Sequence, residues 1–149
     1  DLAAISGHAA TMASFINDQH AYFDEAGDAG LVSAPGPNAL AQAARLGDRV
    51  LEICETGSYA EIVCCMFPSE LLYEVWCARA AEVDVPRPAA LQEWIVSHSE
   101  PPYTDTVRFL TAQVDALDLD DADIARMAVM VGEILDLECV FHDAAYLAD

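Results

Sequence analysis

The chain has 149 residues, of which 54% are hydrophobic and 21% charged, a composition that suits one sizeable buried core and excludes a disordered polypeptide. Its 26 acidic residues and 6 arginines, with no lysine, give a formal net charge of -20. Because such a surface repels phosphate backbones and anionic lipids, we expect neither nucleic acid nor a membrane as a partner.

The sequence shows no sign of a membrane or secretory segment. No window holds the run of about 18 apolar residues that a membrane span needs, and the first residues lack a signal-peptide pattern. We therefore expect a cytoplasmic protein. The cysteines are odd in number and form no CxxC pair, which indicates small core residues rather than disulfides or a zinc site. They are Cys54, Cys64, Cys65, Cys77 and Cys139.

Apolar residues recur at helical spacing along the chain, and no stretch alternates with the period of a strand. The sequence therefore predicts an all-α, single-domain helical bundle. A first helix is expected at about 3–25, followed by a loop rich in glycine and proline up to residue 37. A second helix is expected to begin after Asn38 as its N-cap and to end at Gly57, interpreted as a left-handed C-cap.

Prolines and capping residues separate the later predicted helices. Ser58 and Glu61 have the spacing of a capping box, and Pro68 lies inside the helix that they begin. Thr104 or Asp105 is expected to cap the fifth helix. The predicted helices lie at about 58–82, 89–97, 104–117 and 121–147.

Several polar residues fall on helix faces that are otherwise apolar. Glu138 is the clearest case, because a carboxylate moved out of water needs donors or a proton and otherwise costs several kcal/mol. The predicted apolar stripe around it comprises Ile124, Met127, Ala128, Val131, Leu135, Phe141 and Ala145. The other inward polar residues are Gln19, Tyr22, Ser69, Tyr73 and His98. Converging polar groups among apolar ones predict a small-molecule pocket between helices.

Each of these residues also has a purely structural interpretation. An inward serine such as Ser69 often bonds a carbonyl one turn back, and an inward tyrosine often fills the core with its hydroxyl at the rim. A histidine near a helix end, such as His98, often caps carbonyls. Glu138 is the hardest to explain structurally, because a buried unpaired glutamate is rare.

Near its C-terminus the chain carries the segment Glu138-Cys-Val-Phe141-His142-Asp143-Ala-Ala-Tyr146. This segment resembles the E-x-x-F-W-D-x-A-Y ending of the TenA family. The family comprises thiaminase II and its relatives in the haem-oxygenase-like superfamily. Pro68-Ser69-x-x-x-Tyr73 resembles the family's P-C-x-x-x-Y. Glu93-Trp94-Ile95-x-x-His98 resembles its W-I-x-x-Y, and residues 15–23, with Gln19 and Tyr22, resemble its Q-D-x-x-Y segment. The resemblance implies a helical haem-oxygenase-like fold for residues 1–149, shortened or incomplete between about 24 and 45.

The resemblance implies roles for individual residues. Glu138 would transfer protons, and Ser69 stands where the family has its nucleophilic cysteine. The substrate-binding positions would be Gln19, Tyr22, Leu46, Tyr73, His98 and Phe141. Of these, Gln19 replaces an aspartate, Leu46 and His98 replace tyrosines, and His142 replaces the tryptophan of the terminal motif. The family also implies a homo-oligomer, commonly a tetramer, and neither a metal nor another cofactor.

The family's activity is hydrolysis of thiamin or of 4-amino-5-(aminomethyl)pyrimidine, with a thiolate that attacks the ring. Ser69 needs a base to act in this way, and Glu138 or His98 is a candidate; Cys65, one turn earlier, is an alternative thiol. The Gln19 amide is able to pair with a neutral amidine edge, as glutamine does with adenine. We therefore expect the chain to bind an aminopyrimidine or a related flat heterocycle. Whether it also hydrolyses this ligand, as thiaminase II does, stays open from the sequence.

Two other functions remain open from the sequence. The first is a ligand-binding or assembly protein that has lost its nucleophile and catalyses no reaction. The second is a di-iron oxidase of the same superfamily, in which carboxylates and imidazoles hold two irons. Its candidate ligands would be Asp18, His20, Glu25, Glu138 and His142, although the spacings on the last helix do not complete a ligand set.

Overall fold

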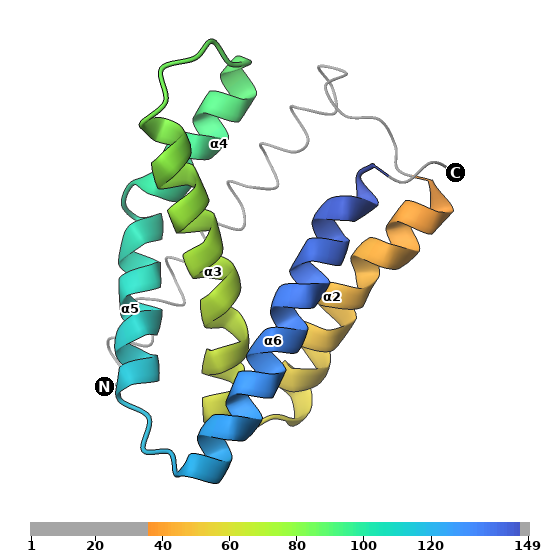
Figure 1. The fold of residues 1–149 in the computed structure, drawn as a ribbon, viewed down its shortest axis with the longest axis vertical. Helices are drawn as coiled ribbons and strands as arrows, with labels where there is room; N and C mark the ends of the chain where they lie inside the picture. Colours follow the sequence, from red (N-terminus) through yellow and green to blue (C-terminus); the bar gives the residue numbers. More distant parts are fainter. Residues whose placement is uncertain (1–35, 147–149) are drawn as a thin grey trace. The chain divides into compact units, whose positions relative to one another are not determined.

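The computed structural model describes residues 36–146, and in this range the chain forms five helices and no strand (Figure 1). They are α2 (Pro37–Thr56), α3 (Tyr59–Ala81), α4 (Ala89–Ser99), α5 (Tyr103–Asp115) and α6 (Asp121–Ala144). The all-α prediction is confirmed. The helix predicted at about 3–25 lies outside the described residues.

The described residues form two compact units. The core unit contains residues 36–73 and 107–146, and the α4 unit contains residues 74–106. Helices α3 and α5 contribute to both units. The single domain over residues 1–149 stays a prediction.

Three helices share the interior of the core unit. Helix α2 lies antiparallel alongside α6 (Figure 1). Their buried side chains pack with those of α3 in one cluster: Ile53, Cys64, Cys65, Met127, Met130 and Ile134. Because burial of one large aliphatic side chain contributes roughly 1.5–3 kcal/mol, this cluster holds the three helices together.

The buried side of α6 differs from the predicted stripe. Ile124, Leu135 and Phe141 are 54%, 36% and 40% exposed, respectively. The residues that are buried are Met127, Met130, Ile134, Glu138 and Ala144. Helix α6 is apolar around most of its circumference, so its sequence pattern does not select one buried side. Packing against α2 and α3 determines which side of α6 is buried. The buried side includes Glu138, as predicted.

The capping box that begins α3 is confirmed. The backbone N–H of Ser58 donates to the Glu61 carboxylate at 2.7 Å, and the N–H of Glu61 donates to the Ser58 hydroxyl at 3.3 Å. Helix α3 continues through the buried Pro68. At the start of α6, the Asp120 carboxylate accepts from the N–H of Asp123 at 2.8 Å. These bonds satisfy amide donors that a helix start leaves open.

Two predicted helix starts and one predicted cap conformation are wrong, whereas α2 does end at Gly57 as predicted. Helix α2 begins at Pro37 with Gly36 as N-cap, so Asn38 is inside the helix; proline favours this first position because it has no N–H to satisfy. Gly57 is extended, with φ -78 and ψ 159, and not left-handed. Glycine fits there because a Cβ would lie 2.5 Å from the Ile53 carbonyl oxygen.

The fifth helix also begins earlier than predicted. Because α5 starts at Tyr103, directly after Pro101 and Pro102, neither Thr104 nor Asp105 is its N-cap. At the other predicted ends, α4 extends to Ser99 and α6 stops at Ala144. Such shifts of a few residues are common where a helix frays into a turn.

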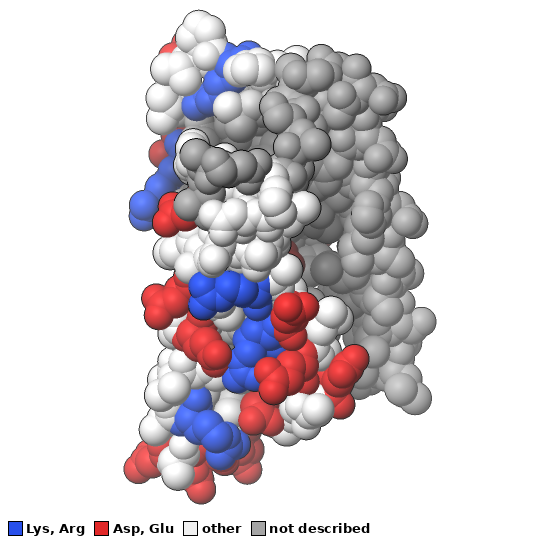
Figure 2. Space-filling model, turned by 90° about the vertical axis from the view of Figure 1, so that its right-hand side faces the viewer, with Lys and Arg blue, Asp and Glu red and all other residues white. Residues whose placement is uncertain are grey.

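Charged side chains of both signs are mixed on the surface. On the face shown in Figure 2, arginines lie among acidic side chains. Arg49 of α2 binds Glu133 of α6 at 3.0 Å and Glu52 of its own helix at 2.8 Å, and these partners raise its pKa further. None of the described helices combines the length and the apolar content needed to cross a bilayer.

Candidate functional site

Glu138 is a carboxylate on the buried side of α6, in the core unit. The residue is 4% exposed, and its Oε2 atom has no hydrogen-bond partner in the part of the chain that the structure describes. The position follows from spacing, because Glu138 stands one turn after Ile134, the most buried side chain of the helix. A buried carboxylate oxygen without a donor is unfavourable unless a proton, a cation or a ligand compensates it.

A histidine lies beside this carboxylate, and a tyrosine is hydrogen-bonded to the histidine. Nε2 of His142 is 3.8 Å from Oε2 of Glu138 and 3.1 Å from the hydroxyl oxygen of Tyr73. Glu138 and His142 are four residues apart, so they share one face of α6, and Tyr73 reaches His142 from α3. Nε2 of His142 is therefore close to two other titratable side chains, Glu138 on the same helix and Tyr73 on α3.

The two distances differ in their chemical meaning. At 3.1 Å, Tyr73 and His142 are hydrogen-bonded, whereas 3.8 Å is too long for a hydrogen bond. Glu138 and His142 are thus an ion pair only when the imidazole is protonated. The His142 side chain is 38% exposed, so water reaches the imidazole while the carboxylate beside it is buried. The group is able to accept N–H donors and to hold a proton.

Ser69 and Cys65 lie on α3, the helix that carries Tyr73. Ser69 is half-buried one turn before Tyr73, and the hydrogen bonds within residues 36–146 include none between its hydroxyl and Glu138. Cys65 is buried in the core cluster, and desolvation raises the pKa of its thiol to about 11. A thiol in that state is not an activated nucleophile, which argues against Cys65 as a replacement for the missing cysteine.

His98 belongs to the α4 unit, where it is buried between two aromatic rings. Its ring centroid lies 4.0 Å from that of Trp94 and 4.7 Å from that of Tyr103. Nδ1 is 2.8 Å from the Trp94 carbonyl oxygen; because a carbonyl only accepts, Nδ1 carries the proton. Burial lowers the pKa of His98, although the Trp94 carbonyl partly opposes this shift. His98 is therefore a neutral imidazole that binds a carbonyl one turn back.

The model of the TENA/THI-4/PQQC family matches residues 41–148. The chain belongs to this family. Searches of curated proteins and of solved structures each gave no significant match. Membership confirms the TenA-like resemblance and, with it, the helical haem-oxygenase-like fold. The match includes Glu138, Ser69 and Tyr73 and begins after Gln19 and Tyr22.

The remaining predicted site residues of this TENA/THI-4/PQQC protein have different surroundings. Leu46 packs against the core cluster from α2. Phe141 is partly exposed, and its ring meets that of His142 edge-on at 5.5 Å. Gln19 and Tyr22 lie outside the described residues, as do Asp18, His20 and Glu25 of the di-iron alternative. Within residues 36–146, no three His, Cys, Asp or Glu side chains are grouped closely enough to hold a metal ion.

Two further residues near Glu138 were not predicted for the site. His142 was noted as a departure from the family motif and as a candidate ligand of the di-iron alternative, but not as a binding residue of the pocket, yet it is the residue that contacts both Glu138 and Tyr73. Its spacing of four residues from Glu138 was the available signal. Cys139 is exposed although it directly follows the buried Glu138.

Proposed function

We propose that this TENA/THI-4/PQQC protein binds a small flat heterocycle of aminopyrimidine type, and that Glu138 accepts a hydrogen bond from an N–H group of this ligand. The observation that carries the proposal is the buried Oε2 atom of Glu138, which has no hydrogen-bond donor among residues 36–146. An N–H donor from a ligand would compensate the desolvated carboxylate, and charge-assisted hydrogen bonds of this kind are among the stronger ones in proteins.

The neighbouring residues support a flat, nitrogen-rich ligand. His142 places Nε2 at 3.8 Å from the carboxylate, Tyr73 is hydrogen-bonded to this nitrogen, and Phe141 adds an aromatic ring beside His142. We propose that Gln19 and Tyr22 complete the binding residues, as the family motif implies. Small-molecule sites typically combine aromatic surfaces with a few polar groups in this way.

Hydrolysis of a C–N bond in the bound pyrimidine is a second proposal, supported by the position of Ser69 one turn before Tyr73 on α3. A serine hydroxyl attacks only when a base removes its proton. Glu138 is the base that we propose, and a bound substrate would have to bring the two side chains within hydrogen-bond reach. Without such a contact, the chain would bind its ligand and leave it unchanged.

Binding is tested by calorimetry and thermal unfolding with 4-amino-5-hydroxymethyl-2-methylpyrimidine. We expect the ligand to raise the unfolding temperature of the wild type. Glu138→Gln should weaken binding at least about tenfold, because it removes the carboxylate charge and changes an acceptor into a partial donor. The control is Glu133→Gln on the exposed side of α6, which should bind normally. Failure of the wild type to bind, or normal binding by Glu138→Gln, would contradict the proposal.

Turnover is tested by the release of hydroxymethylpyrimidine from the aminomethyl compound. Release that is lost in both Ser69→Ala and Glu138→Gln would support hydrolysis through these two residues. An inactive wild type that the aminopyrimidine still stabilises would support a binding protein that catalyses no reaction. Two equivalents of iron in protein purified without chelators would displace both proposals in favour of the di-iron oxidase.

We also propose that the chain assembles as a homo-tetramer, as its family resemblance implies. Light scattering coupled to size-exclusion chromatography measures the mass in solution. A mass of one chain at micromolar concentration would contradict this assembly.

A further inference from the structure

Helix α6 has an exposed apolar side opposite its buried one. Val129 is 75% exposed and Ile124 is 54% exposed, although both are large aliphatic residues. Six exposed residues at helical spacing form this outer face of α6: Ile124, Ala125, Ala128, Val129, Gly132 and Leu135. None of the six carries a charge, in a chain whose formal net charge is -20.

Gly132, in the middle of this outer face, has no explanation within the described part of the chain. Glycine in a helix interior is less favourable than alanine, because it loses more backbone freedom on folding. A Cβ atom at position 132 would meet nothing within 4 Å, so the fold itself leaves room for a side chain. An exposed glycine does, however, let another backbone approach closely. The outer face of α6 is therefore suited to contact with a second helix.

The spacing of the outer face fits a second copy of itself. Its residues Ala125, Ala128, Gly132 and Leu135 follow at steps of three, four and three, a pattern that is the same in both directions. In an antiparallel pair of α6 helices, Ala128 would lie opposite Gly132 of the second copy, and the large Leu135 opposite the small Ala125. In a parallel pair, Leu135 would instead meet its own copy. The sizes of the side chains and the two helix dipoles therefore both favour the antiparallel pair.

We propose that the outer face of α6 binds the same face of a second copy of this chain, antiparallel and around a two-fold axis between Ala128 and Gly132. This inference rests on the homo-oligomer proposed above, and it adds the surface that forms one of its contacts. A tetramer with two-fold axes needs at least two different contacts between copies. The outer face of α6 supplies one of them.

The charge of the chain determines where two copies are able to meet. Two chains of net charge -20 repel each other, and the repulsion is weakest where neither surface is charged. The outer face is uncharged over the turns between the exposed Asp121 and Asp136. At each end of the pair, Asp121 of one copy would lie within one turn of Asp136 of the other, so salt should strengthen the association. Stable interfaces have roughly 20–30 residues a side, so this contact alone is weak.

The first test replaces Gly132 by leucine in the full chain. Gly132→Leu adds a side chain next to the proposed axis, so it should weaken the association at least about tenfold in sedimentation velocity over a series of concentrations. Its helix content by circular dichroism should be no lower than that of the wild type, because the position is open and leucine favours a helix. The matched control is Gly47→Leu, at an equally open and exposed glycine of α2, which should associate normally.

The second test places a charge at Val129. Because this side chain is 75% exposed, Val129→Asp should leave the single chain folded. In the antiparallel pair, the two copies of residue 129 lie within one turn of each other, so the two new carboxylates should repel. Val129→Asn has a similar size without the charge and should associate more strongly than Val129→Asp at about 0.05 M salt. The difference should shrink at about 0.5 M salt, where the charges are screened.

The outcomes separate this inference from the proposed assembly. A wild type that stays a single chain at every concentration would overturn both. A wild-type oligomer that Gly132→Leu leaves unchanged, or that Gly47→Leu weakens equally, would overturn the role of α6 while the assembly stands. A loss of helix content in Gly132→Leu would mean that another segment of the same chain covers the outer face, which would also overturn the contact between copies. Ligand binding by Glu138 is independent of all these results.

Discussion

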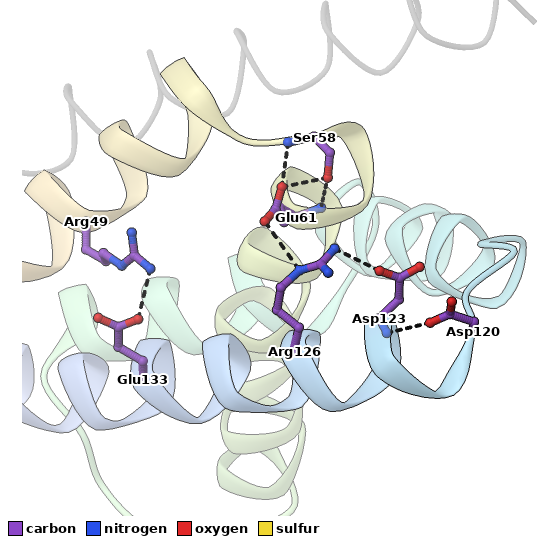
Figure 3. A network of polar contacts seen from close by, with 7 residues as sticks. All are labelled: Arg49, Ser58, Glu61, Asp120, Asp123, Arg126 and Glu133. Carbon is purple, nitrogen blue, oxygen red and sulfur yellow. Dashed lines mark hydrogen bonds and ion pairs between the residues drawn. The ribbon is translucent and has the colours of Figure 1, made fainter.

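The two ends of α6 treat their polar residues in opposite ways. At its beginning, charged side chains lie near the surface and have partners: Arg126 binds Asp123 at 2.9 Å and approaches Glu61 of α3 at 3.8 Å (Figure 3). Towards its end, Glu138 is buried, and one of its oxygens has no hydrogen-bond partner in the described part of the chain. Paired polar groups need no explanation beyond folding, whereas a buried carboxylate oxygen without a hydrogen-bond partner does.

The difference between the two ends of α6 shows that the energetically unfavourable arrangement lies around Glu138. The start of α6 follows local rules, with Asp120 as its cap and Ser58 and Glu61 as the adjacent capping box of α3. Around Glu138, by contrast, a buried carboxylate oxygen lacks the hydrogen bond that buried polar atoms usually have. Departures from local consistency tend to mark functional positions, which is why we place the ligand there.

The largest effect on stability is expected from the apolar core between these two ends. Ile134 is 0% exposed, so Ile134→Ala should lower the free energy of unfolding by about 3–4 kcal/mol through lost burial and a cavity. Urea unfolding measures the change. Ile124→Ala, at a position that is 54% exposed on the same helix, is the matched control and should change stability by less than about 1 kcal/mol. Equal losses in the two variants would contradict the packing described for α6.

A smaller effect of opposite sign is expected at Glu138. Glu138→Met keeps a similar volume and removes a desolvated carboxylate, so we expect stability at pH 7 to rise by about 1–2 kcal/mol while ligand binding is lost. The control is Asp136→Asn, an exposed carboxylate on α6, which should change stability by no more than about 0.5 kcal/mol. A clear loss of stability in Glu138→Met would mean that the carboxylate supports the fold, and the contrast between the two ends of α6 would disappear.

The smallest effect on stability is expected at Glu61, which lies near the start of α6, and it depends on pH. Hydrogen bonds from Ser58, aided by Arg126, hold the pKa of Glu61 below its ordinary value of 4.5. A carboxyl group with a lowered pKa in the folded state contributes stability above the unfolded pKa, and this contribution disappears as pH falls through the folded pKa. Glu61→Gln should therefore lose stability at pH 7 and differ less from the wild type below pH 4.5. A difference that does not change across this range would refute the pairing.

Local patterns in the sequence were sufficient to predict much of the fold. The capping box of Ser58 and Glu61 involves residues three apart, and the structure confirms it. The burial of Glu138 also followed from spacing alone. The left-handed cap at Gly57 was wrong because glycine serves there to avoid the Ile53 carbonyl, a close approach that spacing does not encode.

The details of the candidate site required tertiary contacts. Helix α6 is apolar on several sides, so only its packing against α2 and α3 shows that Ile134 is buried and Ile124 is not. The contact between Tyr73 and His142 joins residues 69 positions apart, and no local pattern predicts it. The family match covers Ser69 and Glu138, whereas their chemical roles stay predictions because they depend on atoms that only a bound ligand would bring together.

The exposed Cys139 offers a practical route to these measurements. Its thiol is accessible although the preceding residue is buried, so a fluorescent label attached there would lie beside the proposed ligand without replacing any residue of the site. Cys54 is also exposed and would first be changed to serine, while Cys64, Cys65 and Cys77 are shielded by burial. The chain thus contains its own attachment point for an optical reporter of ligand binding.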